Sequence, residues 1–263
     1  MRWKKMMLGM LAISVLFSTA MLGKNLWQQE KEELKFTYLR KSVSKVQDDE
    51  PFHSEPEIIR ADSTEDNENK RVILPEYQKL AEENPDFSGW ISIEGTRIDY
   101  PVMQTPDDSE YYLHRNFDGE YSYAGVPFVG TGDMGGENED IFIYGHNMRN
   151  GSMFADLLQY QKEEFWRAHP VIVLDTLWEK RNYEVFAAFY ANEEEWIQEE
   201  GRIYQVLYKN GESKVNVFRT LEGEGGYKTG IILKADSHIL YLVTCSYHEP
   251  GTRFVVAGVL KED

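Results

Sequence analysis

Short apolar runs of strand length recur between residues 90 and 260 of this 263-residue chain. They are rich in β-branched and aromatic residues and are separated by turn-forming residues, a pattern typical of β-strands. The predicted strands are 90–93, 98–102, 126–129, 140–144, 171–174, 183–189, 238–243 and 253–260. A few helices are predicted among them, at 75–83, 152–158, 162–168 and 194–208, without regular strand–helix alternation. The pattern favours a mostly antiparallel barrel or sandwich with helical additions.

The first 23 residues differ from the rest in composition. Arg2, Lys4 and Lys5 precede an uncharged, largely apolar segment, 6–23, which as a helix would be about 27 Å long and could span a bilayer. Basic residues ahead of such a segment predict a membrane signal-anchor with the N-terminus inside and the remainder outside. A signal peptide cleaved near Ala20 is the alternative.

Two further regions follow this segment. Residues 24–46 suggest a weakly amphipathic helix and 47–70 an acidic, disordered linker, so 24–70 is predicted to be a juxtamembrane stalk and linker. Residues 71–263 are predicted to be the folded domain, since 41% of the chain is hydrophobic and 13% aromatic. This region carries most of the net charge of −17. Such a surface repels phosphate backbones, which disfavours nucleic-acid binding.

Three residues suited to acyl-transfer chemistry lie at predicted strand ends. Cys245, the only cysteine, comes just after one apolar run, His146 follows another, and Arg253 begins the last. A cysteine nucleophile needs a base or a positive charge beside it, and acyl transfer needs a donor for the developing oxyanion. The alternative is that Cys245 is a small core residue and His146 a structural histidine.

The other histidines fit structural or exposed positions better than catalytic ones, although His248 is close to Cys245 in sequence. They are His53, His114, His169, His238 and His248. No histidine spacing typical of a metal site occurs, and the acidic residues in 130–140 do not follow the calcium-binding EF-hand pattern. We therefore expect neither a metal nor another cofactor.

Several motifs together resemble the sortases, and class B sortases in particular. They are Tyr144–Met148, Leu242–Cys245 followed by Arg253, and the segments 90–102, 112–119 and 150–154. The resemblance covers residues 75–260, nearly all of the predicted folded region. Val243 departs from it, because class B members often carry serine two positions before the nucleophile.

The resemblance implies an eight-stranded sortase-type β-barrel with N-terminal helices and a helix in the long connection, 191–236, before the cysteine strand. It implies that Cys245 attacks the threonine carbonyl of a C-terminal sorting signal and forms a thioester. His146 would be the general acid and base, and Arg253 would stabilise the oxyanion. The implied substrate-binding residues are Thr244, Val243, Tyr144 and Asn147.

The implied partners are exported proteins with sorting signals and an amine of a cell-wall precursor or peptidoglycan, or a pilin lysine. The implied location is the outer face of a Gram-positive cell membrane. One alternative is a Cys-His thiol hydrolase, although the order of His146 before Cys245 differs from that of papain-like enzymes. Another is a non-enzymatic surface scaffold with a sortase-like barrel.

Overall fold

The computed structural model describes residues 2–48, 71–136, 140–192, 229–231, 233–234, 236–245 and 251–261. The chain divides into two compact units, Met1–Ser42 and Val43–Asp263. Helix α1 spans Arg2–Asp48. The predicted linker beyond residue 48, the predicted helix 194–208, His53 and His248 lie outside the described residues.

The predicted membrane location is corrected by the structure. A membrane-spanning helix needs about 20 consecutive, predominantly apolar residues. Among the described residues, no helix has a stretch that is both long enough and apolar enough to cross a bilayer. The predicted single-pass localisation, with the N-terminus inside, is therefore wrong.

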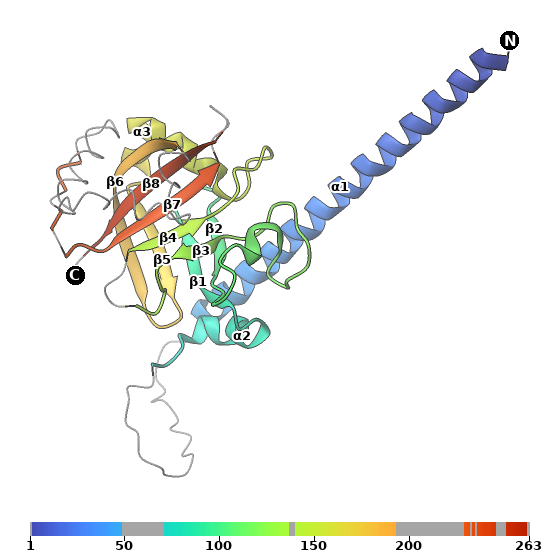
Figure 1. Ribbon diagram of the computed structural model, residues 1–263. Coiled ribbons are helices and arrows are strands. Elements are labelled where there is room, and N and C mark those ends of the chain that lie inside the picture. Colours follow the sequence, from blue (N-terminus) through green and yellow to red (C-terminus); the bar gives the residue numbers. More distant parts are fainter. Residues whose placement is uncertain are drawn as a thin grey trace, which may run out of the picture. The chain divides into compact units, whose positions relative to one another are not determined.

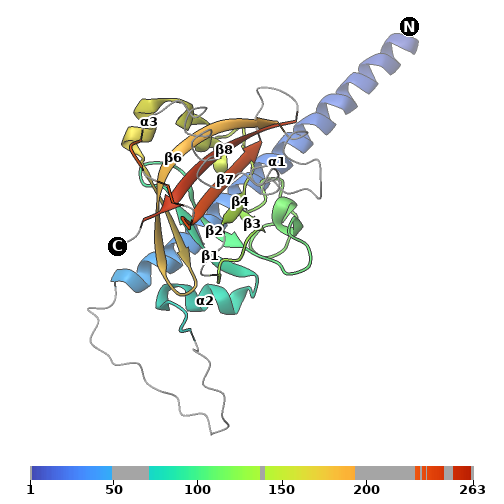
Figure 2. The same ribbon diagram turned by 60° about the vertical axis from the view of Figure 1, so that its left-hand side comes forward.

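Eight strands in the second unit form a closed barrel (Figures 1 and 2). They are β1 (Phe87–Ser92), β2 (Asp99–Met103), β3 (Phe128–Thr131), β4 (Ile141–Tyr144), β5 (Val171–Thr176), β6 (Lys180–Asn192), β7 (Ile239–Cys245) and β8 (Thr252–Leu260). Around the barrel the order is β1-β2-β3-β4-β7-β8-β6-β5, with β5 pairing back to β1. The pairs β2–β3 and β4–β7 are parallel, whereas the other described pairs are antiparallel. The predicted eight-stranded, mostly β fold is confirmed.

Short helices lie before the first strand and between later ones. They are α2 (Pro75–Glu83), the 3₁₀ helices η1 (Tyr111–His114) and η2 (Phe154–Gln161), and α3 (Glu163–Ala168). Helix α2 begins at a proline, whose fixed φ and missing N–H suit a first helical position.

The predicted helix 152–158 is corrected in both type and position. The structure has the 3₁₀ helix η2 here, which begins two residues later. Ser152 does not cap it, since its hydroxyl bonds the Asn150 side chain at 2.7 Å. The helix cannot extend back through Met153, whose φ of 56° lies in the left-handed region.

Strand β7 is buried on both faces. Ile239, Tyr241 and Val243 join one hydrophobic cluster, which includes side chains from β4, β6 and β8. Leu240 and Leu242 alternate with them and are also fully buried. A strand paired on both edges and covered on both faces requires an uninterrupted apolar run, which explains the composition of this segment. Burial decreases only at Cys245, the last residue of the strand.

Candidate functional site

Cys245 and Arg253 lie on neighbouring strands at the same end of the barrel. The antiparallel register of β7 and β8 places their Cα atoms directly opposite each other. Both residues are half-buried. The chain enters β8 through Gly251, whose φ of 77° favours glycine. The register thus places a thiol and a guanidinium on adjacent strand ends.

His146 reaches the same place through the parallel pairing of β4 with β7. The bonding continues past the end of β4, because Gly145 N donates to Val243 O at 3.1 Å. The Thr244 hydroxyl donates to Gly145 O at 2.7 Å, and Asn147 Nδ2 donates to Cys245 O at 3.1 Å. The residues on both sides of His146 are therefore bonded to the cysteine strand.

The His146 ring is held by the end of η1. Its Nε2 lies 2.9 Å from the Leu113 carbonyl oxygen, and its ring stacks on that of His114 with centroids 5.2 Å apart. A carbonyl oxygen only accepts hydrogen bonds, so Nε2 carries the hydrogen. In the neutral ring Nδ1 then holds the lone pair that can accept a proton.

The surroundings of His146 favour the neutral form of its ring. Burial lowers the pKa of His146 because it penalises the charged ring, whereas the hydrogen bond to Leu113 raises it. The nearby His114 and Arg253 lower this pKa further by like-charge repulsion. At neutral pH the ring is therefore uncharged and able to act as a base.

Tyr144 lies beside the same guanidinium. Its ring stacks on Phe128, with centroids 5.8 Å apart and an interplanar angle of 17°. Burial raises the pKa of Tyr144 to about 12, although Arg253 lowers it and Glu110 raises it. The phenol therefore keeps its proton at neutral pH and can donate a hydrogen bond at the site.

Three of the four predicted substrate-binding residues are buried. Val243 is 1% exposed, Thr244 2% and Asn147 8%. Thr244 and Asn147 use their side chains to bond β7 to the loop that carries His146 (145–153, the His146 loop), through Gly145 O and Cys245 O. Val243 belongs to the hydrophobic cluster. Tyr144 is half-buried. Substrate contact by these four residues stays a prediction.

The loop after His146 closes on itself before η2 begins. Phe154 N donates to His146 O at 2.9 Å, and Asn147 forms an isolated β-bridge with Met153. Met153 adopts φ 56° and ψ −130°, which is costly for a residue with a side chain. The bond from Met153 N to the Tyr100 hydroxyl, at 3.1 Å, helps to hold this conformation.

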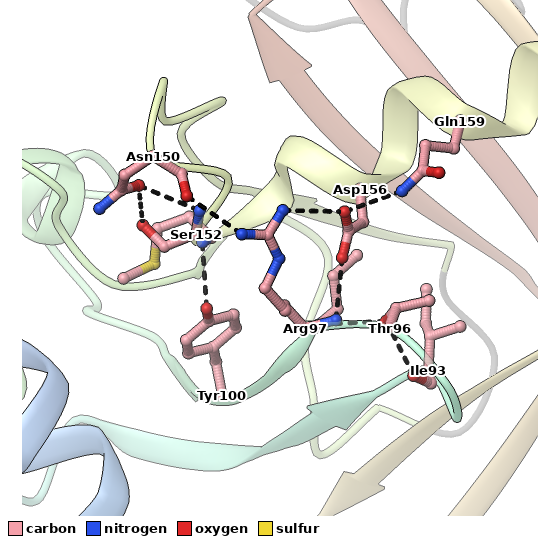
Figure 3. Close-up of polar contacts among 10 residues, drawn as sticks. Ile93, Thr96, Arg97, Tyr100, Asn150, Ser152, Asp156 and Gln159 are labelled. Atoms are coloured by element: carbon pink, nitrogen blue, oxygen red, sulfur yellow. Dashed lines mark hydrogen bonds and ion pairs between the residues drawn. The ribbon is translucent and has the colours of Figure 1, made fainter.

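A polar network anchors this loop to the turn between β1 and β2 (Figure 3). Asp156, 6% exposed, accepts from Arg97 N at 2.9 Å, Arg97 Nη2 at 3.4 Å and Gln159 Nε2 at 2.9 Å. Arg97 Nη1 donates to Asn150 O at 3.0 Å. The Arg97 side chain thus connects Asp156 to the backbone of the His146 loop.

Replacing Asp156 by alanine is expected to destabilise the fold by about 1–3 kcal/mol, because it removes a charged acceptor and leaves part-buried donors unsatisfied. The melting temperature should fall by roughly 2–4 °C for each kcal/mol in a domain of this size. Thermal unfolding followed by circular dichroism would measure the change. Asp107→Ala, at an exposed position, is the matched control and should change stability by less than about 0.5 kcal/mol. Equal melting temperatures for both variants would contradict a structural role for the network.

The surface beside η1 is hollowed. A pocket of about 370 Å³ is lined by Asp108, Glu110, Tyr111, Leu113, His114, Arg115 and Tyr121. Leu113 and His114 therefore belong both to this pocket and to the surroundings of His146. Within the part of the chain that the structure describes, no three His, Cys, Asp or Glu side chains are grouped so that they could hold a metal ion.

Two residues that contact His146, Leu113 and His114, were not among the predicted site residues. Leu113 acts through its backbone oxygen, which no residue type would reveal. His114 lies in a polar segment and was expected to be structural or exposed. Only its place inside 112–119, one of the segments that resemble a known family, could have pointed to it.

Comparisons with known proteins agree with this architecture. The sortase domain family model matches residues 91–261. Sortase B of Listeria monocytogenes is 40% identical over 133 residues, which cover 49% of this chain and 51% of that protein. The match thus spans about half the length of this relative.

Solved structures extend the similarity. The X-ray structure of a mutant form of Clostridium perfringens sortase B has 32% identity and a TM-score of 0.61, covering 71% of this chain and 87% of that one. A Staphylococcus aureus sortase B–substrate complex has 21% identity and a TM-score of 0.69, covering 90% and 99%. At that identity the second comparison concerns the fold alone.

Proposed function

Because the chain belongs to the sortase family, we propose that it is a cysteine transpeptidase of the class B type. It cleaves a C-terminal sorting signal after threonine, holds the protein as a thioester on Cys245, and transfers it to an amine. The observation that supports this most directly is the placement of Cys245 opposite Arg253, with the His146 loop bonded to the cysteine strand.

The first half of the reaction forms the thioester. His146 Nδ1 takes the proton from the Cys245 thiol as the sulfur attacks the threonine carbonyl carbon. The carbonyl oxygen gains negative charge, which the Arg253 guanidinium stabilises by charge-assisted hydrogen bonds. The carbon–nitrogen bond then breaks, and the His146 proton passes to the leaving amine.

The second half releases the protein from the enzyme. An incoming amine attacks the thioester carbonyl carbon and loses a proton to His146 Nδ1. The carbon–sulfur bond breaks, an amide forms, and the proton returns to the Cys245 sulfur. We propose an amine of a cell-wall peptide, or a pilin lysine, as the acceptor. His146, Cys245 and Arg253 all lie within residues 71–263, which supports assigning the activity to this region.

Mass spectrometry of the full chain with a library of sorting-signal peptides tests this function. The expected result is an acyl adduct on Cys245, which triglycine, added as an amine, converts into an amide product. Since Cys245 is the only cysteine, a thioester can form nowhere else. Release of the peptide acyl group only as the free acid, although the amine is present, would favour a Cys-His thiol hydrolase. The absence of an adduct with every peptide would favour a non-enzymatic surface scaffold.

Arg253→Lys is expected to slow thioester formation by about 10²–10³-fold, the loss typical of removing an oxyanion donor. A lysine ammonium keeps the charge but does not reproduce the planar fork of donors that guanidinium provides. Quenched-flow mass spectrometry would measure the acylation rate. Arg149→Lys, the same change on the exposed surface of the His146 loop, should remain within twofold of the unmodified chain. A rate for Arg253→Lys above half of normal would contradict the assigned role.

A further inference from the structure

A second imidazole lies face to face with that of His146. The rings of His114 and His146 have centroids 5.2 Å apart and are inclined by only 25°. The residue before His114 contributes the carbonyl that accepts from His146 Nε2. Two successive residues of η1 thus contact the same ring, Leu113 at an edge nitrogen and His114 on a face.

The end of η1, which makes these two contacts, is hydrogen-bonded to several other segments of the chain. Tyr112, in the same turn of η1, is 2% exposed, and its hydroxyl bonds Asp86 and Asn84, each at 2.9 Å. Ser122 N donates to His114 O at 3.0 Å. The end of η1 is therefore fixed relative to the barrel.

The neighbouring chain packs closely against the same turn. Gly125 has a φ of 61°, and a Cβ added there would lie 2.4 Å from the Leu113 carbonyl oxygen. The chain therefore has no room for a side chain at residue 125. This close approach helps to hold the Leu113 carbonyl at its distance from His146.

We propose that His114 is a positioning residue for the transpeptidase reaction, whose ring holds the plane of the His146 imidazole so that Nδ1 remains available to exchange protons at Cys245. This inference rests on the proposed function and adds a residue to it. A single hydrogen bond at Nε2 leaves the ring able to rotate about that contact. A stacked ring opposes this rotation, because the two faces would lose contact.

The stacked ring also has an electrostatic effect. Two protonated imidazoles at this distance repel each other, and His114 accordingly contributes to lowering the pKa of His146. The other titratable or charged side chains on the strands beside His146 are Tyr144 on β4, Tyr241 and Cys245 on β7, and Arg253 on β8. Of these, Arg253 acts on His146 in the same direction as His114.

The test compares two substitutions at one position in the full chain. His114→Ala removes the ring, whereas His114→Phe keeps a flat ring that cannot bind a proton. We expect His114→Ala to lower kcat by about 10- to 100-fold, since small displacements of a catalytic group have effects of this size. KM for the best peptide of the library should stay within twofold. His114→Phe should recover at least half of the lost activity on a logarithmic scale.

Nuclear magnetic resonance titration of the His146 ring provides a readout that does not require activity. The pKa of His146 should be higher in His114→Phe than in the unmodified chain, because the electrostatic contribution by which His114 lowers it is lost. Tyr121→Ala is the matched control, as it removes an exposed ring that lies beside His114, with centroids 6.4 Å apart. It should leave both kcat and the pKa of His146 unchanged.

Three results would overturn the proposal. The first is a kcat for His114→Ala within twofold of that of the unmodified chain. The second is a decrease in kcat as large in His114→Phe as in His114→Ala. The third is an unchanged pKa of His146 in His114→Phe. Melting temperatures show whether His114→Ala is folded. If it is not, kcat and the pKa of His146 in His114→Phe decide the outcome. Failure of the transpeptidase function itself would be recognised separately, as the absence of any acyl adduct in the unmodified chain.

Discussion

A chain with Cys245 replaced by alanine is expected to form no thioester and to lose transpeptidation by about 10⁴-fold or more, the scale typical of losing a catalytic nucleophile. The methyl group of alanine cannot attack the threonine carbonyl, and no other cysteine is present to replace it. Mass spectrometry for the adduct and chromatography for the amide product would measure the two losses.

The fold should survive this change. Cys245 is half-buried at the end of β7, so losing one sulfur atom there should alter stability by less than about 1 kcal/mol. Thr244→Ser is a suitable control on the adjacent residue, since it retains the hydroxyl that bonds Gly145 O. Substantial transpeptidation by Cys245→Ala, with the barrel intact, would disprove the proposed mechanism.

Replacing His146 by alanine is the second change with a large expected effect. General acid–base catalysis contributes about 10²–10⁴-fold, and His146 is assigned both proton transfers in each half-reaction. We therefore expect thioester formation to fall by at least this factor at neutral pH. Adding free imidazole should restore part of the rate, because a small base can occupy the vacated space.

The control for this variant is His238→Ala. His238 is the residue just before β7, at the end opposite to Cys245, and is half-buried. The His238→Ala substitution should leave the rate of thioester formation within twofold of that of the unmodified chain. If His146→Ala acylated at a normal rate, the thiol would not depend on this imidazole, and the role of His146 would need to be abandoned.

The strands of the barrel could be predicted because their pattern is local. Apolar runs bounded by turn-forming residues indicated all eight strands, and the residues at their ends included His146, Cys245 and Arg253. The run before Cys245 indicated a buried strand, and β7 is indeed covered on both faces. These conclusions need only residue types and their spacing along the chain.

The errors arose where distant residues decide the conformation. The helix was predicted at 152–158, but the structure has a 3₁₀ helix that begins at Phe154. Met153 adopts a φ of 56°, which is held in part by a hydrogen bond to Tyr100, far away in sequence. The stacking of His114 on His146 is likewise a contact between residues distant in sequence, which no local pattern predicts.

The amino-acid sequence by itself determined which residues could carry the chemistry, since a lone thiol, an imidazole and a guanidinium at strand ends are visible without coordinates. Only the tertiary structure decided that they lie at the same end of the barrel. The parallel pairing of β4 with β7 places His146 beside the cysteine strand across a long separation in sequence, and the next residue, Asn147, bonds Cys245 O. The β7–β8 register then sets Arg253 opposite the thiol. Pairing of this kind depends on the closure of the whole barrel, which no local pattern of residues specifies.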